Sequence, residues 1–174
     1  DGIVLVWTLN NVILNPGIHM TLQSNTDPLY IFSDHSLPVK DIHIGKGGIR
    51  CRLVTASIDR TCKIYDLCSG ELLLNVVFDK GLSSVTMDIL ETNIFVGTVD
   101  GNILQYSIAN PPRTKEYHIS NKDESMVFPF HSKTVTCLSV SLDCETLISG
   151  SNDENLIVWH IPSRQKTHSI PHRG

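Results

Sequence analysis

The sequence predicts an all-β fold built from a repeated unit, and two observations carry this prediction. An acidic residue precedes an aromatic ring by six positions at four places in the chain. Each acid lies in a turn-like context, and each ring ends a short strand-like run with alternating apolar residues. A turn and strand that recur about every 40 to 60 residues are typical of a β-propeller. The four pairs are Asp1 and Trp7, Asp59 and Tyr65, Asp100 and Tyr106, and Asp153 and Trp159.

The composition indicates a folded globular domain. The chain has 174 residues, of which 41% are hydrophobic and 18% charged. The net charge of -4 disfavours a nucleic-acid-binding surface over most of the molecule, although a local patch stays open. No apolar run reaches the roughly 18 residues of a membrane helix, so no membrane contact is predicted. The five cysteines lack a CxxC pair and favour a reducing compartment.

Four consecutive parts of the chain are expected. Residues 1–32 predict the end of a partial blade with an insertion. Residues 33–79 predict a first complete blade, from DHSLPVKDIHI to GELLLNVVF. Residues 80–129 predict a second blade with a long loop, and residues 130–174 predict a third, which contains TLISGSNDENLIVWHI.

Two stretches interrupt the repeat, at residues 10–33 and 109–129. Both are expected to be strands with long loops, which in repeat proteins lie on one face and often bind partners. Three blades and a fragment are too few to close a ring, because propellers have about 4 to 8 blades. The sequence is therefore expected to be part of a longer protein.

Two of the complete blades contain a histidine, a hydroxyl residue, the turn aspartate and the ring at matched positions. These residues resemble the structural hydrogen-bond tetrad of the WD-repeat family. The resemblance implies that the aspartate accepts from the histidine, the histidine contacts the hydroxyl, and the hydroxyl meets the indole. Such a network would lock the turn, because buried polar groups need partners. The two sets are His35, Thr55, Asp59 and Tyr65 in the first blade, and His131, Ser149, Asp153 and Trp159 in the third.

The second blade departs from the tetrad pattern. It has Val96 where the hydroxyl residue would lie and no histidine at the expected place. This blade is therefore predicted to rely on apolar packing. The rings of the first and second blades are also Tyr65 and Tyr106 rather than tryptophan.

The set of Ser149, His131 and Asp153 also allows a hydrolase triad. We favour the structural interpretation, because the set recurs at one blade position, no GxSxG motif is present, and Ser149 is predicted to lie on a strand. No Cys/His pair has zinc-site spacing, so no metal, cofactor or catalytic residue is predicted. The segment of residues 45–52, with Lys46, Arg50 and Arg52, predicts a flexible turn and leaves a polyanion contact open.

Longer strings are more specific than the repeat. The runs SGELLL, VVFD and VTMD, and FHSKTVTCLSVSLDCETLISGSNDENLIVWHIPSRQ, resemble the WD-repeat subunit of a nuclear complex that processes ribosomal RNA. The resemblance covers nearly the whole chain and implies a ring of about seven blades. It implies a non-enzymatic scaffold in large ribosomal subunit biogenesis. It places the protein in the nucleus, in both nucleolus and nucleoplasm, with the cytoplasm as a further location.

The resemblance also implies protein partners. These are a proline-, glutamate- and leucine-rich protein, a testis-expressed helical-repeat protein, a Las-one-like nuclease and a SUMO protease, together with pre-ribosomal particles. Direct RNA contact stays open. A second hypothesis is a WD-repeat adaptor or substrate receptor in signalling or ubiquitin ligation, which the propeller fold equally allows.

Candidate partner contacts are apolar and aromatic residues within or beside the two insertions. The alternative is that these residues pack each insertion onto its own blade. They are Leu29, Tyr30, Tyr117 and Phe128.

Overall fold

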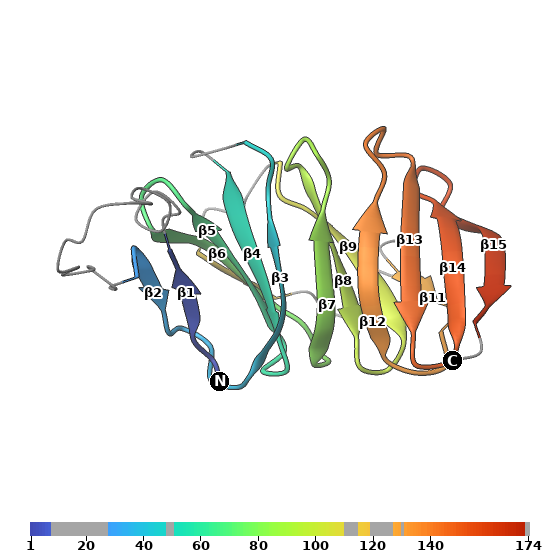
Figure 1. Cartoon of the computed structure of the whole chain (residues 1–174), viewed down its shortest axis with the longest axis horizontal. Coiled ribbons are helices and arrows are strands. Elements are labelled where there is room, and N and C mark those ends of the chain that lie inside the picture. Colours follow the sequence, from blue (N-terminus) through green and yellow to red (C-terminus); the bar gives the residue numbers. More distant parts are fainter. Residues whose placement is uncertain (8–27, 48–50, 110–114, 119–126, 130, 173–174) are drawn as a thin grey trace, which may run out of the picture.

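The computed structural model describes residues 1–7, 28–47, 51–109, 115–118, 127–129 and 131–172. Across these ranges the regular elements are all β-strands, so the predicted all-β fold is confirmed. Three larger sheets and one two-stranded sheet lie side by side in a row, as in part of a propeller (Figure 1). Most of the two expected insertions lies outside the described residues.

Each of the three larger sheets begins with an inner strand and continues outward through antiparallel neighbours. The partial blade pairs β1 (Val4–Val6) with β2 (Tyr30–Phe32). The first blade contains β3 (Val39–Ile44), β4 (Arg52–Ser57), β5 (Thr61–Asp66) and β6 (Glu71–Val77). The second contains β7 (Leu82–Met87), β8 (Asn93–Thr98), β9 (Asn102–Ser107) and β11 (Val127–Pro129). The third contains β12 (Val135–Val140), β13 (Thr146–Ser151), β14 (Asn155–His160) and β15 (Gln165–Pro171).

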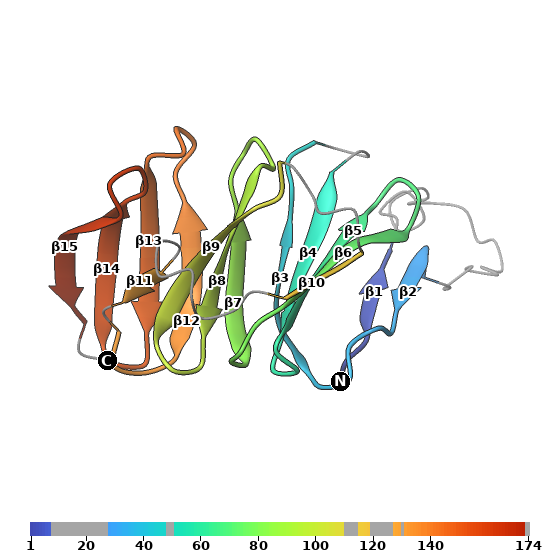
Figure 2. The ribbon, with the colours of Figure 1, turned by 180° about the vertical axis from the view of Figure 1, so that it is seen from behind.

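One strand crosses the boundary expected between the first and second blades. The strand β10 (Glu116–His118) lies within the segment assigned to the second blade, yet it pairs in parallel with β6 of the first (Figure 2). The amide of Asn75 on β6 donates to the Glu116 carboxylate at 3.2 Å, and the Asn75 N–H donates to the Lys115 carbonyl at 2.7 Å. The added strand thus pairs the outer edge of β6, whose backbone groups would otherwise need other partners.

The core lies between the blades rather than inside any one of them. Strands β4 and β8 are buried along nearly their whole length, because each has a neighbouring blade on both faces. Their sequences accordingly read as short apolar runs rather than strict alternations. The cluster between the first and second blades includes Val54, Ile64, Val76, Phe78, Val85, Ile94, Val96 and Tyr106. The cluster between the second and third includes Phe95, Ile103, Phe128, Val135, Leu147, Ile157 and Trp159.

The partial blade buries one face only. Val4 and Phe32 pack against Leu53 and Tyr65 of the first blade. The opposite face carries exposed apolar side chains, among them Trp7, which is 53% exposed. Trp7 therefore lies on an uncovered face, unlike the other three rings of the repeat.

Polar contacts tie the inner strands of neighbouring blades together. The Asp41 carboxylate of β3 accepts from the Val85 N–H of β7 at 2.8 Å. At the equivalent position of β7, the Ser84 hydroxyl donates to the Val135 carbonyl of β12 at 3.2 Å. The pairing of each inner strand with its neighbour shifts in register at these positions, as expected where a bulge redirects a side chain.

Gly97 on β8 allows the second and third blades to approach this closely. A Cβ atom there would lie 2.2 Å from the Ser84 hydroxyl oxygen and 2.8 Å from the Val135 Cβ. We predict that Gly97→Ala lowers the free energy of unfolding by about 1–3 kcal/mol, because the added methyl group forces the blades apart. Urea denaturation of the intact protein measures this loss.

Gly150→Ala is the matched control, since Gly150 occupies the same blade position in the third blade. Its added Cβ would meet the Cys137 sulfur at 2.6 Å, but Cys137 is exposed and its side chain can rotate away. An equal loss of stability in the two variants would contradict the role assigned to the interface at Gly97.

Candidate functional site

The third blade brings together all four residues of its expected tetrad. The Trp159 indole on β14 lies 2.9 Å from the Ser149 hydroxyl on β13. The same hydroxyl lies 2.8 Å from Nε2 of His131, and Nδ1 of His131 lies 2.9 Å from the Asp153 carboxylate. Ser149 and Trp159 are fully buried. The network thus joins two central strands to the turn between them and to the segment before β12.

One arrangement of protons satisfies all four residues of this network. The Trp159 indole can only donate, so the Ser149 oxygen accepts from it and its own proton remains for His131 Nε2. His131 then carries its proton on Nδ1 and donates it to Asp153. A neutral imidazole satisfies every group in the set, which is the condition for burying such a network at low cost.

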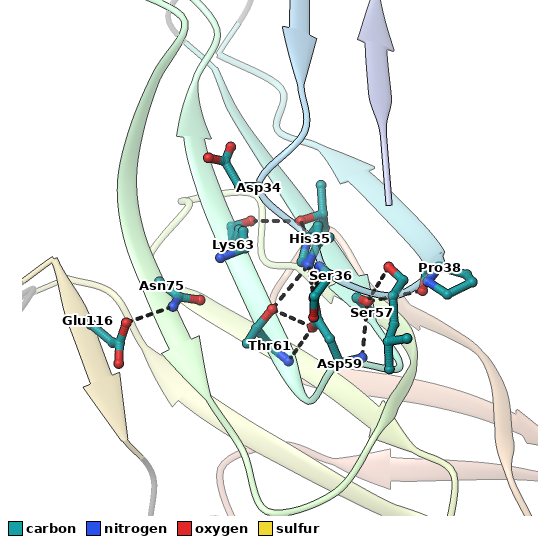
Figure 3. Close-up of polar contacts among 12 residues, drawn as sticks. Asp34, His35, Ser36, Pro38, Ser57, Asp59, Thr61, Lys63, Asn75 and Glu116 are labelled. Atoms are coloured by element: carbon teal, nitrogen blue, oxygen red, sulfur yellow. Dashed lines mark hydrogen bonds and ion pairs between the residues drawn. The ribbon is translucent and has the colours of Figure 1, made fainter. Parts of the chain in front are cut away.

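The first blade forms only part of the expected tetrad. Nδ1 of His35 lies 2.9 Å from the Asp59 carboxylate (Figure 3), and Nε2 lies 2.7 Å from the Thr55 hydroxyl. The fourth member departs from the expectation, because the Tyr65 hydroxyl donates to the Asp34 carboxylate at 3.1 Å instead of meeting Thr55. A phenol carries its donor at the tip of the ring, beyond the place where an indole N–H lies. The Tyr65 ring itself is buried and stacks on Phe32 at a centroid distance of 4.1 Å.

The second blade replaces the network with apolar side chains, as its sequence predicts. Phe78 precedes β7 by the same four positions as His35 precedes β3 and His131 precedes β12. Phe78 and Val96 are both buried in the cluster between the first and second blades, together with Tyr106. Phe78 is not among the residues predicted from sequence, although it precedes the following strand by the same spacing as the two histidines.

The turn after each aspartate shows what the networks hold in place. The residue after the aspartate is left-handed in all three complete blades, with φ of 71° at Arg60, 96° at Gly101 and 64° at Glu154. Glycine adopts this conformation freely, whereas other residues rarely do. The blade that lacks the histidine network has the glycine. In the other two, the aspartate also accepts from two backbone N–H groups, those of Ser36 and Thr61 on Asp59 and those of Ser132 and Asn155 on Asp153.

The electrostatics of these turns favour ionised aspartates. Burial raises the pKa of the Asp59 carboxyl, but hydrogen bonds from Thr61 and His35 outweigh it and the pKa lies below its usual value. Burial likewise opposes the hydrogen bonds from His131, Ser132 and Asn155 at Asp153, whose pKa is also lowered. Burial lowers the pKa of His35, and this effect exceeds the opposing influence of Asp59. A neutral His35 beside an ionised Asp59 matches the proton arrangement of the third blade.

Comparison with known sequences follows this division between the blades. The family model described as "WD domain, G-beta repeat" matches residues 26–66 and 122–160, which contain both histidine networks. Strands β7, β8 and β9 of the second blade, where the network is apolar, lie outside the two matches. This chain belongs to the WD-repeat family.

Relatives extend the similarity over the whole WD-repeat chain. It is 41% identical over 175 residues to WD repeat-containing protein 18 of Danio rerio, with 100% of the chain and 39% of that protein covered. It is 38% identical over 176 residues to WD repeat-containing protein 18 of Homo sapiens, with the same coverage. Pre-rRNA-processing protein IPI3 of Yarrowia lipolytica is 30% identical over 179 residues, with 98% of the chain and 40% of that protein covered. The chain thus spans about two fifths of the length of these relatives.

The complete burial of the Ser149 hydroxyl disfavours the hydrolase interpretation of the third blade. Ser149 has no exposed surface, and its oxygen is shared between Trp159 and His131. A nucleophile must reach a substrate atom, which this serine could do only if the blade opened.

In the described part of the chain no group of three or more metal-ligating side chains is present, and no helix could span a membrane.

The four candidate partner contacts occupy different environments. Phe128 on β11 is fully buried and meets Trp159 of the third blade edge-on at a centroid distance of 5.6 Å. Tyr30 packs against Phe32, and its hydroxyl donates to the Cys68 carbonyl of the first blade at 3.0 Å. Both side chains thus pack within the fold, which favours the packing alternative over a partner contact. Leu29 and Tyr117 are 51% and 37% exposed, and their binding role stays a prediction.

We predict that Ser149→Ala lowers the free energy of unfolding by about 1–3 kcal/mol, because both the indole N–H and the imidazole Nε2 lose their partner. Thermal or urea denaturation measures the loss. Val96→Ala in the second blade provides a comparison that removes side-chain volume at the same blade position without removing a hydrogen bond. A Ser149→Ala protein with wild-type stability would contradict the structural role of the network.

Proposed function

We propose that this chain is part of a non-enzymatic scaffold subunit of a nuclear complex that acts in ribosomal RNA processing and large ribosomal subunit biogenesis. One observation carries the proposal. The chain is similar over almost all of its length both to animal WD repeat-containing protein 18 and to a fungal protein named for pre-rRNA processing. A second fungal relative, pre-rRNA-processing protein crb3/ipi3 of Schizosaccharomyces pombe, is 29% identical over 95% of the chain.

The geometry supports a scaffold rather than a catalyst. The hydroxyl, histidine and aspartate sets of the first and third blades are buried and satisfied within the blades, where they stabilise turns. A row of rigid blades with exposed turns suits the binding of other proteins, which is the common use of such repeats. The proposed partners are the protein subunits of a pre-rRNA-processing complex, namely the four proteins implied by the sequence resemblance, and the proposed location is the nucleus and nucleolus.

Depletion and replacement of the intact protein in cells of its own organism tests this proposal. We expect depletion to cause accumulation of large-subunit ribosomal RNA precursors that retain spacer sequence, measured by blot hybridisation. Re-expression of the wild-type protein should restore processing. Ser149→Ala should also restore it when its abundance is matched to wild type, because the hydroxyl has a structural role.

Two results would count against the proposal. Intact spacer processing after depletion would remove the ribosomal role and favour an adaptor in another pathway. Failure of an abundant, folded Ser149→Ala protein to restore processing would indicate chemistry at Ser149 and would contradict the scaffold role.

A further inference from the structure

We propose that the outer edge of β6 is a docking site for an extended protein segment in which a carboxamide side chain directly precedes an aromatic ring. The strand β10 occupies this site as an internal competitor (Figure 2). The site, called the β6 edge, consists of the outward backbone groups of Asn75–Val77, the Asn75 side chain and the ring of Tyr106. The inference adds a binding site and a partner chemistry to the scaffold role and does not depend on ribosomal RNA processing.

The strand β10 is held on the β6 edge by few contacts. It is three residues long, and residues 115–118 are all exposed. Its backbone pairs with β6 in parallel, and the Asn75 N–H donates to the Lys115 carbonyl at 2.7 Å. Segments with few buried contacts and exposed hydrogen bonds open at a low cost in free energy. Release of β10 would therefore leave the antiparallel strands β3 to β6 in place.

The ring of Tyr117 on β10 shows one side chain that the β6 edge accepts. Tyr117 lies opposite Val76, and its ring centroid is 5.4 Å from that of Tyr106 on β9 of the second blade. Tyr106 is buried in the cluster between the first and second blades. Aromatic rings at this separation attract each other. Because Tyr117 is 37% exposed, the place that it occupies is reached from solvent, so the ring of another segment fits there.

The side-chain oxygen of Asn75 points to an occupant other than β10. The Asn75 amide nitrogen donates to the Glu116 carboxylate at 3.2 Å (Figure 3). The Asn75 oxygen is buried, yet within the described ranges it accepts no hydrogen bond. An ionised carboxylate has no proton to donate, so Glu116 satisfies only one half of this amide. A buried acceptor without a donor is costly, and β10 is therefore an imperfect fit to the site.

A glutamine or asparagine at the position of Glu116 would satisfy both halves of the Asn75 amide. A carboxamide carries a donor beside an acceptor, as Asn75 itself does. A partner segment with this side chain gains a hydrogen bond that β10 lacks. The gain offsets the advantage of β10, which is tethered and so has a high effective concentration.

The mode of binding is strand addition to a sheet edge. In this mode backbone hydrogen bonds supply affinity, and side chains on alternating faces supply specificity. Glu116 and Tyr117 are consecutive and so lie on opposite faces of the sheet, one beside Asn75 and the other beside Tyr106. The occupant is therefore an extended segment with the order carboxamide, then aromatic ring.

Fluorescence anisotropy with the complete protein that contains this chain tests the β6 edge. The probe is a fluorescein-labelled peptide with the sequence of residues 114–119, TKEYHI, and the change Glu116→Gln. We expect the protein variant Tyr117→Pro to bind the probe about tenfold more tightly than the wild type, because β10 loses its ring and a backbone N–H. The peptide that keeps Glu116 should bind about tenfold more weakly than the probe, and the protein variant Asn75→Ala should abolish this difference.

The double variant Val77→Cys with His118→Cys provides the matched control, because these residues are paired across β6 and β10. Neighbouring strands lie at a separation that a disulfide spans. Oxidation should lock β10 in place and abolish probe binding, and reduction should restore it. Mass spectrometry identifies the bridge, and circular dichroism shows that each variant is folded.

Four results would overturn the proposal. The first is an absence of probe binding to folded Tyr117→Pro, and the second is equal affinity of the wild type for the two peptides. The third is equal binding by the oxidised and reduced double variant. The fourth is dimerisation of the reduced double variant without probe binding, which would assign the β6 edge to β10 of a second copy of the protein.

Discussion

The contact between neighbouring blades is the constraint on which the rest of this structure depends. No single sheet encloses a core, and the buried side chains of β4 and β8 pack against side chains of the neighbouring sheets. Asp41 and Ser84 add polar contacts between the blades, because the side chain of each forms a hydrogen bond with the backbone of the next blade. Stability in such an array is close to a sum of blade terms and interface terms, so a change at an interface affects two blades together. The strand β10 adds a further link between these two blades, since it lies between two strands of the second blade in the sequence and pairs with β6 of the first.

The turn networks and the interfaces between blades stabilise different parts of the fold. In the first and third blades a histidine, a hydroxyl and an aspartate hold a left-handed residue that is not glycine, at Arg60 and Glu154. In the second blade glycine removes the strain, and Phe78 and Val96 fill the space with apolar contacts. Replacement of a buried polar network by well-packed apolar residues is often neutral for stability, which explains how one array accommodates both solutions. These turns lie along the lower edge of the row in Figure 1.

The sequence predicts the repeated features well, because each is a short pattern that recurs. The strands and the turn aspartates follow from spacing, and the third-blade tetrad follows from the resemblance to the WD-repeat family. The hydrogen bond from Tyr65 to Asp34 does not follow from the sequence pattern, because the partner of the phenol depends on which residue the fold places beside its hydroxyl. The pairing of β10 with β6 and the burial of Phe128 depend on contacts between segments far apart in the chain, which periodicity does not encode. The close approach of the blades at Gly97 also cannot be predicted from the sequence, because it depends on where Val135 of the next blade lies.

The scaffold role is tested most directly by where the intact protein sediments. A sucrose gradient of nuclear extract, combined with affinity capture and mass spectrometry of each fraction, measures this distribution. The account predicts that part of the protein co-sediments with precursors of the large ribosomal subunit and is captured together with proteins of ribosomal RNA processing. Confinement of the protein to light fractions, with ubiquitin-ligase or signalling proteins as its captured partners, would contradict the account.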